Sequence, residues 1–72
     1  MYEIKDILNM TNHDKYIVTN KTILNDKIYY MLINYDNLLD WVIVYEKDNE
    51  LIEELDDKTI TKICELFQKK GN

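Results

Sequence analysis

The sequence predicts an α+β domain: a four-stranded antiparallel β-meander with a C-terminal α-helix packed on one face and a short N-terminal helix. Residues 15–55 are rich in β-branched and aromatic side chains and are interrupted by polar segments, as in consecutive strands joined by turns. Residues 60–67 then carry apolar side chains at helical spacing. Because 72 residues have room for one core, residues 1–72 are predicted to form a single small acidic domain.

The N-terminal segment has a helical pattern of apolar residues. Ile4, Ile7 and Leu8 recur at helical spacing within residues 2–10, which predicts a short helix. The polar residues 11–14 follow and predict a loop.

A β-hairpin is predicted for residues 15–35. Asn25 and Asp26 separate two apolar segments, and polar pairs of this kind form two-residue hairpin turns. Placing Leu24 opposite Lys27 fixes the register. Three further pairs then face one another: Tyr16 and Tyr35, Val18 and Ile33, and Thr22 and Tyr29. The second strand has apolar side chains on both faces, which predicts a central position in the sheet.

Two more strands and a helix complete the prediction. Trp41–Tyr45 is a continuous β-branched and aromatic segment, and Asp48-Asn49 forms the next turn. Glu50–Leu55 is a weaker strand whose charges suit a sheet edge. Asp56 or Asp57 is the predicted N-cap of the closing helix, because a carboxylate accepts the free N–H groups of the first turn. The apolar stripe of that helix consists of Ile60, Ile63, Cys64 and Phe67.

The charge balance excludes several partners. Fourteen Asp and Glu stand against nine basic residues, all of them lysine, giving a net charge of −5. We expect no direct contact with nucleic acid, since phosphate binding needs a basic patch and base recognition depends heavily on arginine. No apolar segment is long enough to cross a bilayer and no signal peptide is evident, so a cytoplasmic protein without membrane contact is predicted. The abundance of Ile, Asn, Lys and Tyr is typical of a low-GC bacterium or its phage.

Few groups are present for catalysis or metal binding. The chain has no serine, and His13 and Cys64 are its single histidine and cysteine. His13 lies in a polar loop and Cys64 on an apolar helix stripe, so a nucleophile–base pair is not expected. One Cys and one His cannot complete a zinc site, and no glycine-rich phosphate loop exists. We therefore predict no enzyme activity, no catalytic residue, no cofactor and no metal.

The carboxylates are concentrated between Glu46 and Asp57, where seven acids accompany one lysine. This segment is either a solvated turn and edge strand kept soluble by charge, or a docking face for a basic protein surface. Aromatic rings with polar tips are favoured at interfaces, which makes nearby Trp41 and Tyr45 candidate anchors. The candidate partner-binding residues are Trp41, Tyr45, Glu46, Asp48, Glu50, Glu53, Glu54, Asp56 and Asp57.

The order of these segments resembles a bacterial family of small acidic proteins classed as a domain of unknown function. The resemblance runs from Lys15 to Lys70 and rests on WVIVYEKDNELIEELDD followed by ITKICELFQK. The chain departs from the family in being less acidic and in having an additional N-terminal segment. Because the family has no established activity, the resemblance implies the fold and no function.

A non-catalytic protein-binding module is the function that the sequence favours. Its concrete form is a small acidic inhibitor that docks on the basic groove of a nucleic-acid-handling protein, as phage anti-defence proteins, including anti-CRISPR proteins, do. This is an analogy of size and charge. The alternative is a homo-oligomeric structural or regulatory module, with a homodimer formed through an exposed sheet face.

Overall fold

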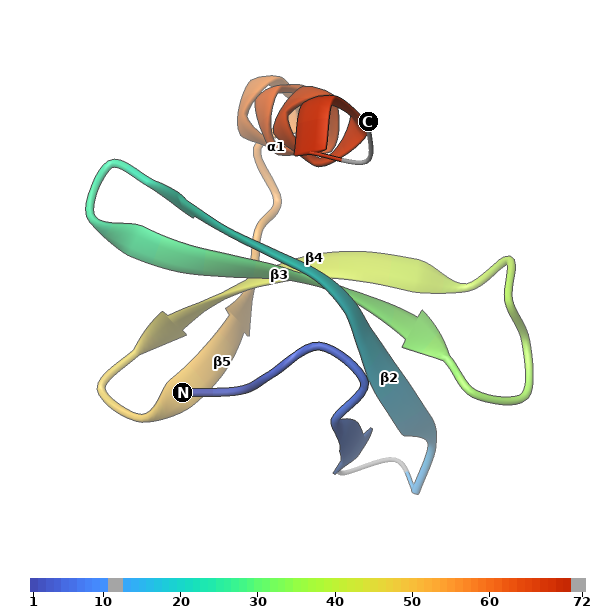
Figure 1. The fold of residues 1–72 in the computed structure, drawn as a ribbon. Coiled ribbons are helices and arrows are strands. Elements are labelled where there is room, and N and C mark those ends of the chain that lie inside the picture. Colours follow the sequence, from blue (N-terminus) through green and yellow to red (C-terminus); the bar gives the residue numbers. More distant parts are fainter. Residues whose placement is uncertain (11–12, 71–72) are drawn as a thin grey trace.

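The structure, a computed structural model, describes residues 1–10 and 13–70 and has an α+β fold. One antiparallel sheet holds the strands in chain order, β1-β2-β3-β4-β5, and one helix follows (Figure 1). The elements are β1 (Ile7–Asn9), β2 (Lys15–Leu24), β3 (Lys27–Asn34), β4 (Trp41–Lys47), β5 (Glu50–Glu53) and α1 (Asp57–Lys70). The predicted meander and C-terminal helix are confirmed, and the predicted central position of the strand that is now β3 is confirmed as well.

The predicted N-terminal helix is wrong, and the sheet has five strands instead of four. Leu8 in β1 pairs with Tyr16 in β2, and Lys5 turns the chain with a φ of 81°. An isolated helix of this length is marginal, whereas an added strand gains backbone hydrogen bonds and packing. Part of the predicted loop, residues 11–12, lies outside the described residues. His13, on the described side, has a φ of 69° and lies in the connection to β2.

A β-bulge alters the predicted register of the first long hairpin. The turn at Asn25-Asp26 is confirmed, since both residues have the positive φ that a type I′ hairpin turn requires. The pairs next to this turn, Leu24 with Lys27 and Thr22 with Tyr29, are also confirmed. Beyond them the register shifts by one residue between Val18 and Asn20. The two remaining predicted pairs are therefore wrong, and the structure pairs Val18 with Leu32 and Tyr16 with Asn34.

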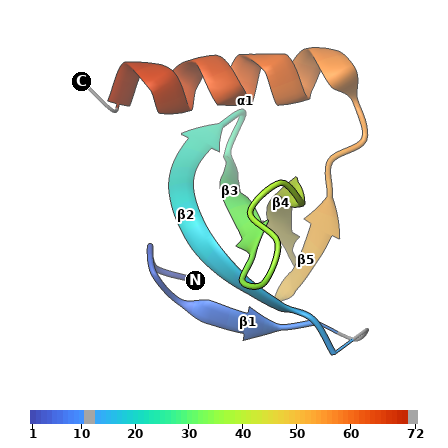
Figure 2. The same cartoon turned by 90° about the vertical axis from the view of Figure 1, so that its right-hand side faces the viewer.

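This register shift determines which face of the sheet each large side chain of β2 and β3 occupies. On one side of the sheet, the inner face, the buried residues are Tyr16, Val18, Tyr30, Leu32 and Val44. The sheet curls around this face, and Tyr2, Leu8 and Met10 from the N-terminal segment pack against it (Figure 2). On the other side, the helix face, the buried cluster consists of Tyr29, Ile43, Ile63 and Phe67.

Helix α1 covers only the helix face, as predicted, and its start is defined by a cap. The Asp56 carboxylate accepts a hydrogen bond from the Thr59 backbone N–H at 3.0 Å and another from the Thr59 hydroxyl at 2.7 Å. These bonds lower the pKa of Asp56. Asp56 is therefore the N-cap, one of the two residues predicted for that role. Strand β5 ends earlier than predicted, at Glu53, but lies at the sheet edge as expected.

We expect Ile63→Ala to destabilise the protein strongly, because Ile63 is the fully buried contact of α1 with the helix face. The free energy of unfolding should fall by about 2–5 kcal/mol, the usual cost of deleting a large aliphatic side chain from a core. Urea unfolding followed by circular dichroism measures the change. Thr61→Ala, on the exposed side of the same helix, is the control and should shift it by less than about 0.5 kcal/mol.

Candidate protein-binding surfaces

Strand β4 carries both predicted aromatic anchors on the helix face, but in different surroundings. Tyr45 is half-buried: its ring centroid lies 5.7 Å from that of Tyr29, and the Lys27 ammonium lies 4.4 Å from the Tyr45 centroid. Trp41 begins the strand, opposite Ile33, and keeps 46% of its surface exposed. Trp41 is therefore available to a partner, whereas Tyr45 is committed to packing.

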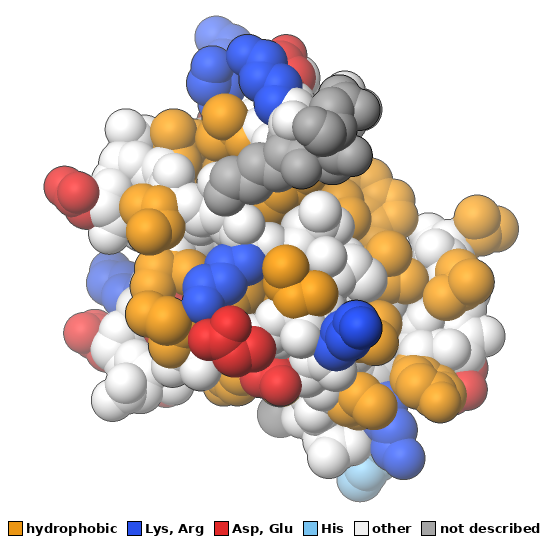
Figure 3. Space-filling view, in the orientation of Figure 1, with side chains coloured by type: hydrophobic (Ala, Val, Ile, Leu, Met, Phe, Trp, Pro, Cys, Tyr) orange, Lys and Arg blue, Asp and Glu red, His pale blue; other side chains and the backbone are white. Residues whose placement is uncertain are grey.

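An apolar surface surrounds Trp41. The β3–β4 loop immediately before it presents Leu38 and Leu39, which are 73% and 90% exposed, together with Tyr35 at 56%. Ile17 and Ile33 continue the surface across the sheet, since the register aligns them with Trp41. Figure 3 shows hydrophobic side chains gathered over this loop, at the right of the molecule. We define the Trp41 surface as Ile17, Ile33, Tyr35, Leu38, Leu39 and Trp41.

Hydrogen bonds hold the β3–β4 loop in one conformation. The buried Asn34 side chain accepts from the backbone N–H of Asp36 at 2.8 Å and of Asn37 at 3.2 Å. Asn37 in turn accepts from Leu39 N–H at 3.2 Å, and the Asn34 N–H donates to the Asp40 carbonyl at 2.9 Å. The exposed leucines are thus carried by a structured turn. Sequence reasoning missed this loop, although Leu38-Leu39 between polar residues is a visible signal.

Three buried tyrosines use carboxylates as hydrogen-bond acceptors. The hydroxyl of Tyr16 donates to Asp40 at 2.8 Å, and that of Tyr29 donates to Glu54 at 3.0 Å. The hydroxyl of Tyr30 donates to Glu46. Burial, and then the bond to the carboxylate, raises the pKa of Tyr29 and of Tyr30 to about 12. The pKa of Tyr16 is also raised, chiefly by its bond to Asp40.

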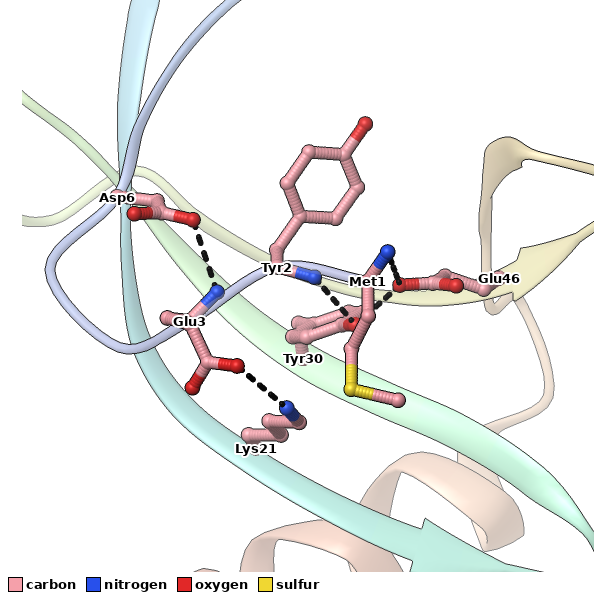
Figure 4. A network of polar contacts seen from close by, with 7 residues as sticks. All are labelled: Met1, Tyr2, Glu3, Asp6, Lys21, Tyr30 and Glu46. Carbon is pink, nitrogen blue, oxygen red and sulfur yellow. Dashed lines mark hydrogen bonds and ion pairs between the residues drawn. The ribbon is translucent and has the colours of Figure 1, made fainter.

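Glu46 lies at the centre of a network on the inner face (Figure 4). Its carboxylate is 3.8 Å from the N-terminal ammonium of Met1, in addition to accepting from Tyr30. The Tyr30 hydroxyl accepts from the Tyr2 backbone N–H at 3.0 Å, and the rings of Tyr2 and Tyr30 meet edge to face. The charge of Glu46 is therefore used to attach the N-terminal segment to the sheet.

The nine predicted partner-binding residues consequently divide into groups. Glu46 and Glu54 bind buried tyrosines, and Asp56 caps α1. Three exposed acids, which we call the acidic hairpin, remain around the β4–β5 turn: Asp48, Glu50 and Glu53. Asp57 is exposed in the first turn of α1. Trp41 lies at the end of β4 away from the turn, so the structure does not bring it next to the acidic hairpin.

The groups considered for catalysis are not assembled into a site. Cys64 is partly buried on α1, whereas His13 is exposed in the connection between β1 and β2. Within residues 1–10 and 13–70, no cluster of three or more His, Cys, Asp or Glu side chains is placed to hold a metal ion. In the same part of the chain, no helix has the length and apolarity needed to span a membrane. The absence of enzyme activity stays a prediction.

Comparisons with known proteins bring no functional assignment. No protein family, curated protein or solved structure matches the chain. The resemblance in the sequence therefore adds nothing to the site, and the candidate surfaces rest on geometry and chemistry alone.

We expect the protein to lose stability in alkali because of its buried tyrosines. The pKa of Tyr30 is about 12 in the folded protein against 10.0 in an exposed tyrosine, so the hydroxyl stays neutral while the unfolded chain ionises. The free energy of unfolding should thus fall as the pH rises from about 10 to about 12. Urea unfolding at a series of pH values measures the slope. Tyr30→Phe should reduce the slope without abolishing it, since the pKa of Tyr29 is also raised to about 12, and Tyr35→Phe should leave the slope unchanged. Equal slopes in the wild type and Tyr30→Phe would contradict this origin.

Proposed function

We propose that this protein is a non-catalytic protein-binding module that contacts its partner through the Trp41 surface. The observation that carries the proposal is the exposure of Leu38, Leu39 and Trp41 side by side in the chain. A contiguous exposed apolar patch is costly in water, and in soluble proteins such patches mark interaction sites. Tryptophan is also among the residues that contribute most binding energy at interfaces.

The hydrogen bonds within the β3–β4 loop support the same proposal. Because Asn34 and Asn37 fix the backbone of the loop, Leu38 and Leu39 need little ordering when a partner binds. The charged Asp36 is exposed within the loop, so a charged group borders the apolar centre, while Asp40 accepts the hydrogen bond of Tyr16. An apolar centre with a polar rim is the usual composition of a protein interface.

The first test removes the apolar side chains without changing the charge. A tagged Leu38→Ser/Leu39→Ser variant should recover at least about tenfold less of its partner from source-cell lysate than the wild type, as expected for loss of interface anchors. Quantitative mass spectrometry of the bound proteins gives the ratio. Ile23→Ser is the matched control, because Ile23 is 67% exposed but lies in the β2–β3 hairpin. Equal recovery by all three proteins would rule out the Trp41 surface as the contact.

The alternative occupant of the Trp41 surface is a second copy of the chain. A homo-oligomeric module predicts association that persists at high salt and disappears in the Leu38→Ser/Leu39→Ser variant. Light scattering after size-exclusion chromatography distinguishes this alternative from binding to a different protein.

A second candidate function is the acidic inhibitor that docks on a basic groove. It is favoured by the exposure of Asp48, Glu50 and Glu53 on one hairpin, since these acids are not used to bind tyrosines or to cap the helix. Their charge would attract a basic surface over a distance of about one Debye length, roughly 8–10 Å at physiological salt. The partner in this case is a basic protein, and one that handles nucleic acid has the required groove.

Charge-matched variants test the acidic hairpin. Asp48→Asn/Glu53→Gln should slow association with a basic partner severalfold at low salt, and the difference should shrink as salt is added. Asp26→Asn/Glu65→Gln is the control: it alters the net charge equally, and Asp26 occupies a hairpin turn at positive φ as Asp48 does. Biolayer interferometry measures the rates. If both variants slow association equally, net charge and not the hairpin is responsible.

A further inference from the structure

The two edge strands of the curled sheet line one cleft. The sheet begins with β1 and ends with β5, and both reach the open side of the curl (Figure 2). Between them lies a cleft of about 620 Å³. The described residues that line it are Tyr2, Ile7, Leu8, Asn9, Met10, Glu50 and Leu51. The cleft shares no residue with the Trp41 surface.

Strand β5 turns backbone groups that do not bond to β4 outward, along the edge where Leu51 lines the cleft. In an antiparallel ladder, alternate residues bond to the neighbouring strand and the residues between them point away. The β4–β5 turn has two residues, so Glu50 bonds back to Lys47, and the Glu54 N–H bonds to Ile43 at 2.9 Å. The backbone of Leu51 and of Glu53 therefore points outward from β5. Such an edge is a template for another strand.

The side chains around the cleft specify what that strand would carry. Toward the inner face, Leu8, Met10 and Leu51 are half-buried against the core and leave apolar surface open. Toward the outer rim, Glu50 is the charged residue among those described in the lining. A strand placed here would face apolar surface on one side and the Glu50 carboxylate on the other, whereas Glu53 shares the inner face of β5 with Leu51 and is not among the residues that line the cleft.

We propose that the cleft between β1 and β5 binds an extended segment of a basic protein by strand addition to β5, with apolar side chains turned toward Leu8 and Leu51 and lysine or arginine turned toward Glu50. Main-chain hydrogen bonds to Leu51 and Glu53 provide affinity, and the alternation of side chains provides selectivity. The added strand also covers the apolar surface that the curl leaves open. The cleft adjoins the Trp41 surface, because Ile7 in the cleft pairs with Ile17 in that surface. The proposal does not rest on the Trp41 surface binding a partner, since strand addition uses the backbone of β5.

A synthetic peptide tests the proposal directly. The probe is acetyl-Lys-Val-Lys-Ile-Lys-Val-Lys-amide, titrated into isotope-labelled protein and followed by the backbone amide signals in NMR spectra. We expect shifts in residues 7–9 and 50–53 and slower hydrogen exchange at Leu51 and Glu53. The Glu50→Gln variant should bind this peptide severalfold more weakly, and a peptide with glutamate at each lysine position should bind at least about tenfold more weakly.

Two N-methylated forms of the probe, each blocking alternate backbone N–H groups, separate strand addition from attraction of charge. The form that blocks the donors facing β5 should bind at least about tenfold more weakly than the probe, since two hydrogen bonds are lost. The proposal would be overturned if both N-methylated forms bound the protein as tightly as the unmodified probe does. It would also be overturned if the probe shifted only the amide signals of the Trp41 surface. A third result would also overturn the proposal. If the amide signals of β1 and β5 shift with protein concentration when no peptide is present, a second copy of the chain occupies the cleft.

Discussion

The architecture follows from a sheet that is apolar on both faces and has to be covered twice by a short chain. In β3, Tyr29 is buried toward the helix and Tyr30 and Leu32 toward the inner face, so neither side can remain open to water. Helix α1 covers one face, and residues 1–10 and 13–70 form no second helix for the other. The inner face is instead closed by curling the sheet and by laying the N-terminal segment over it. The Trp41 surface and the cleft between β1 and β5 are places where this covering ends.

Tyrosine in these core positions adds a second requirement, because each buried hydroxyl needs an acceptor. The acceptors are carboxylates from strands or loops that are distant in sequence: Asp40, Glu46 and Glu54. These bonds join the β3–β4 loop, β4 and the segment after β5 to the core. Part of the negative charge is thereby structural, and only the remainder can act on a partner.

How much the sequence predicts depends on how local the signal is. The turns at Asn25-Asp26 and Asp48-Asn49 and a cap at Asp56 or Asp57 are local patterns, and the structure confirms the turns and places the cap at Asp56. Of the predicted helix stripe, Ile60, Ile63 and Phe67 belong to the helix-face cluster. The bulge beside Thr19 leaves no such pattern, and β1 is too short for alternation to outweigh a helical spacing. The site is harder to predict: a list of acids does not show which are bound by tyrosines, nor that Leu38 and Leu39 are exposed.

The order of the strands has a consequence for how the chain reaches its fold. Every strand pairs with its neighbour in sequence, so the sheet can grow one hairpin at a time and closes only short loops as it does so. Topologies dominated by such local contacts fold faster than sheets built from distant segments. The β2–β3 hairpin, with the longest ladder and a two-residue turn, is the natural starting point. We expect helix α1 and the N-terminal segment to dock afterwards, one on each face, because each packs on a face that the sheet has to provide first.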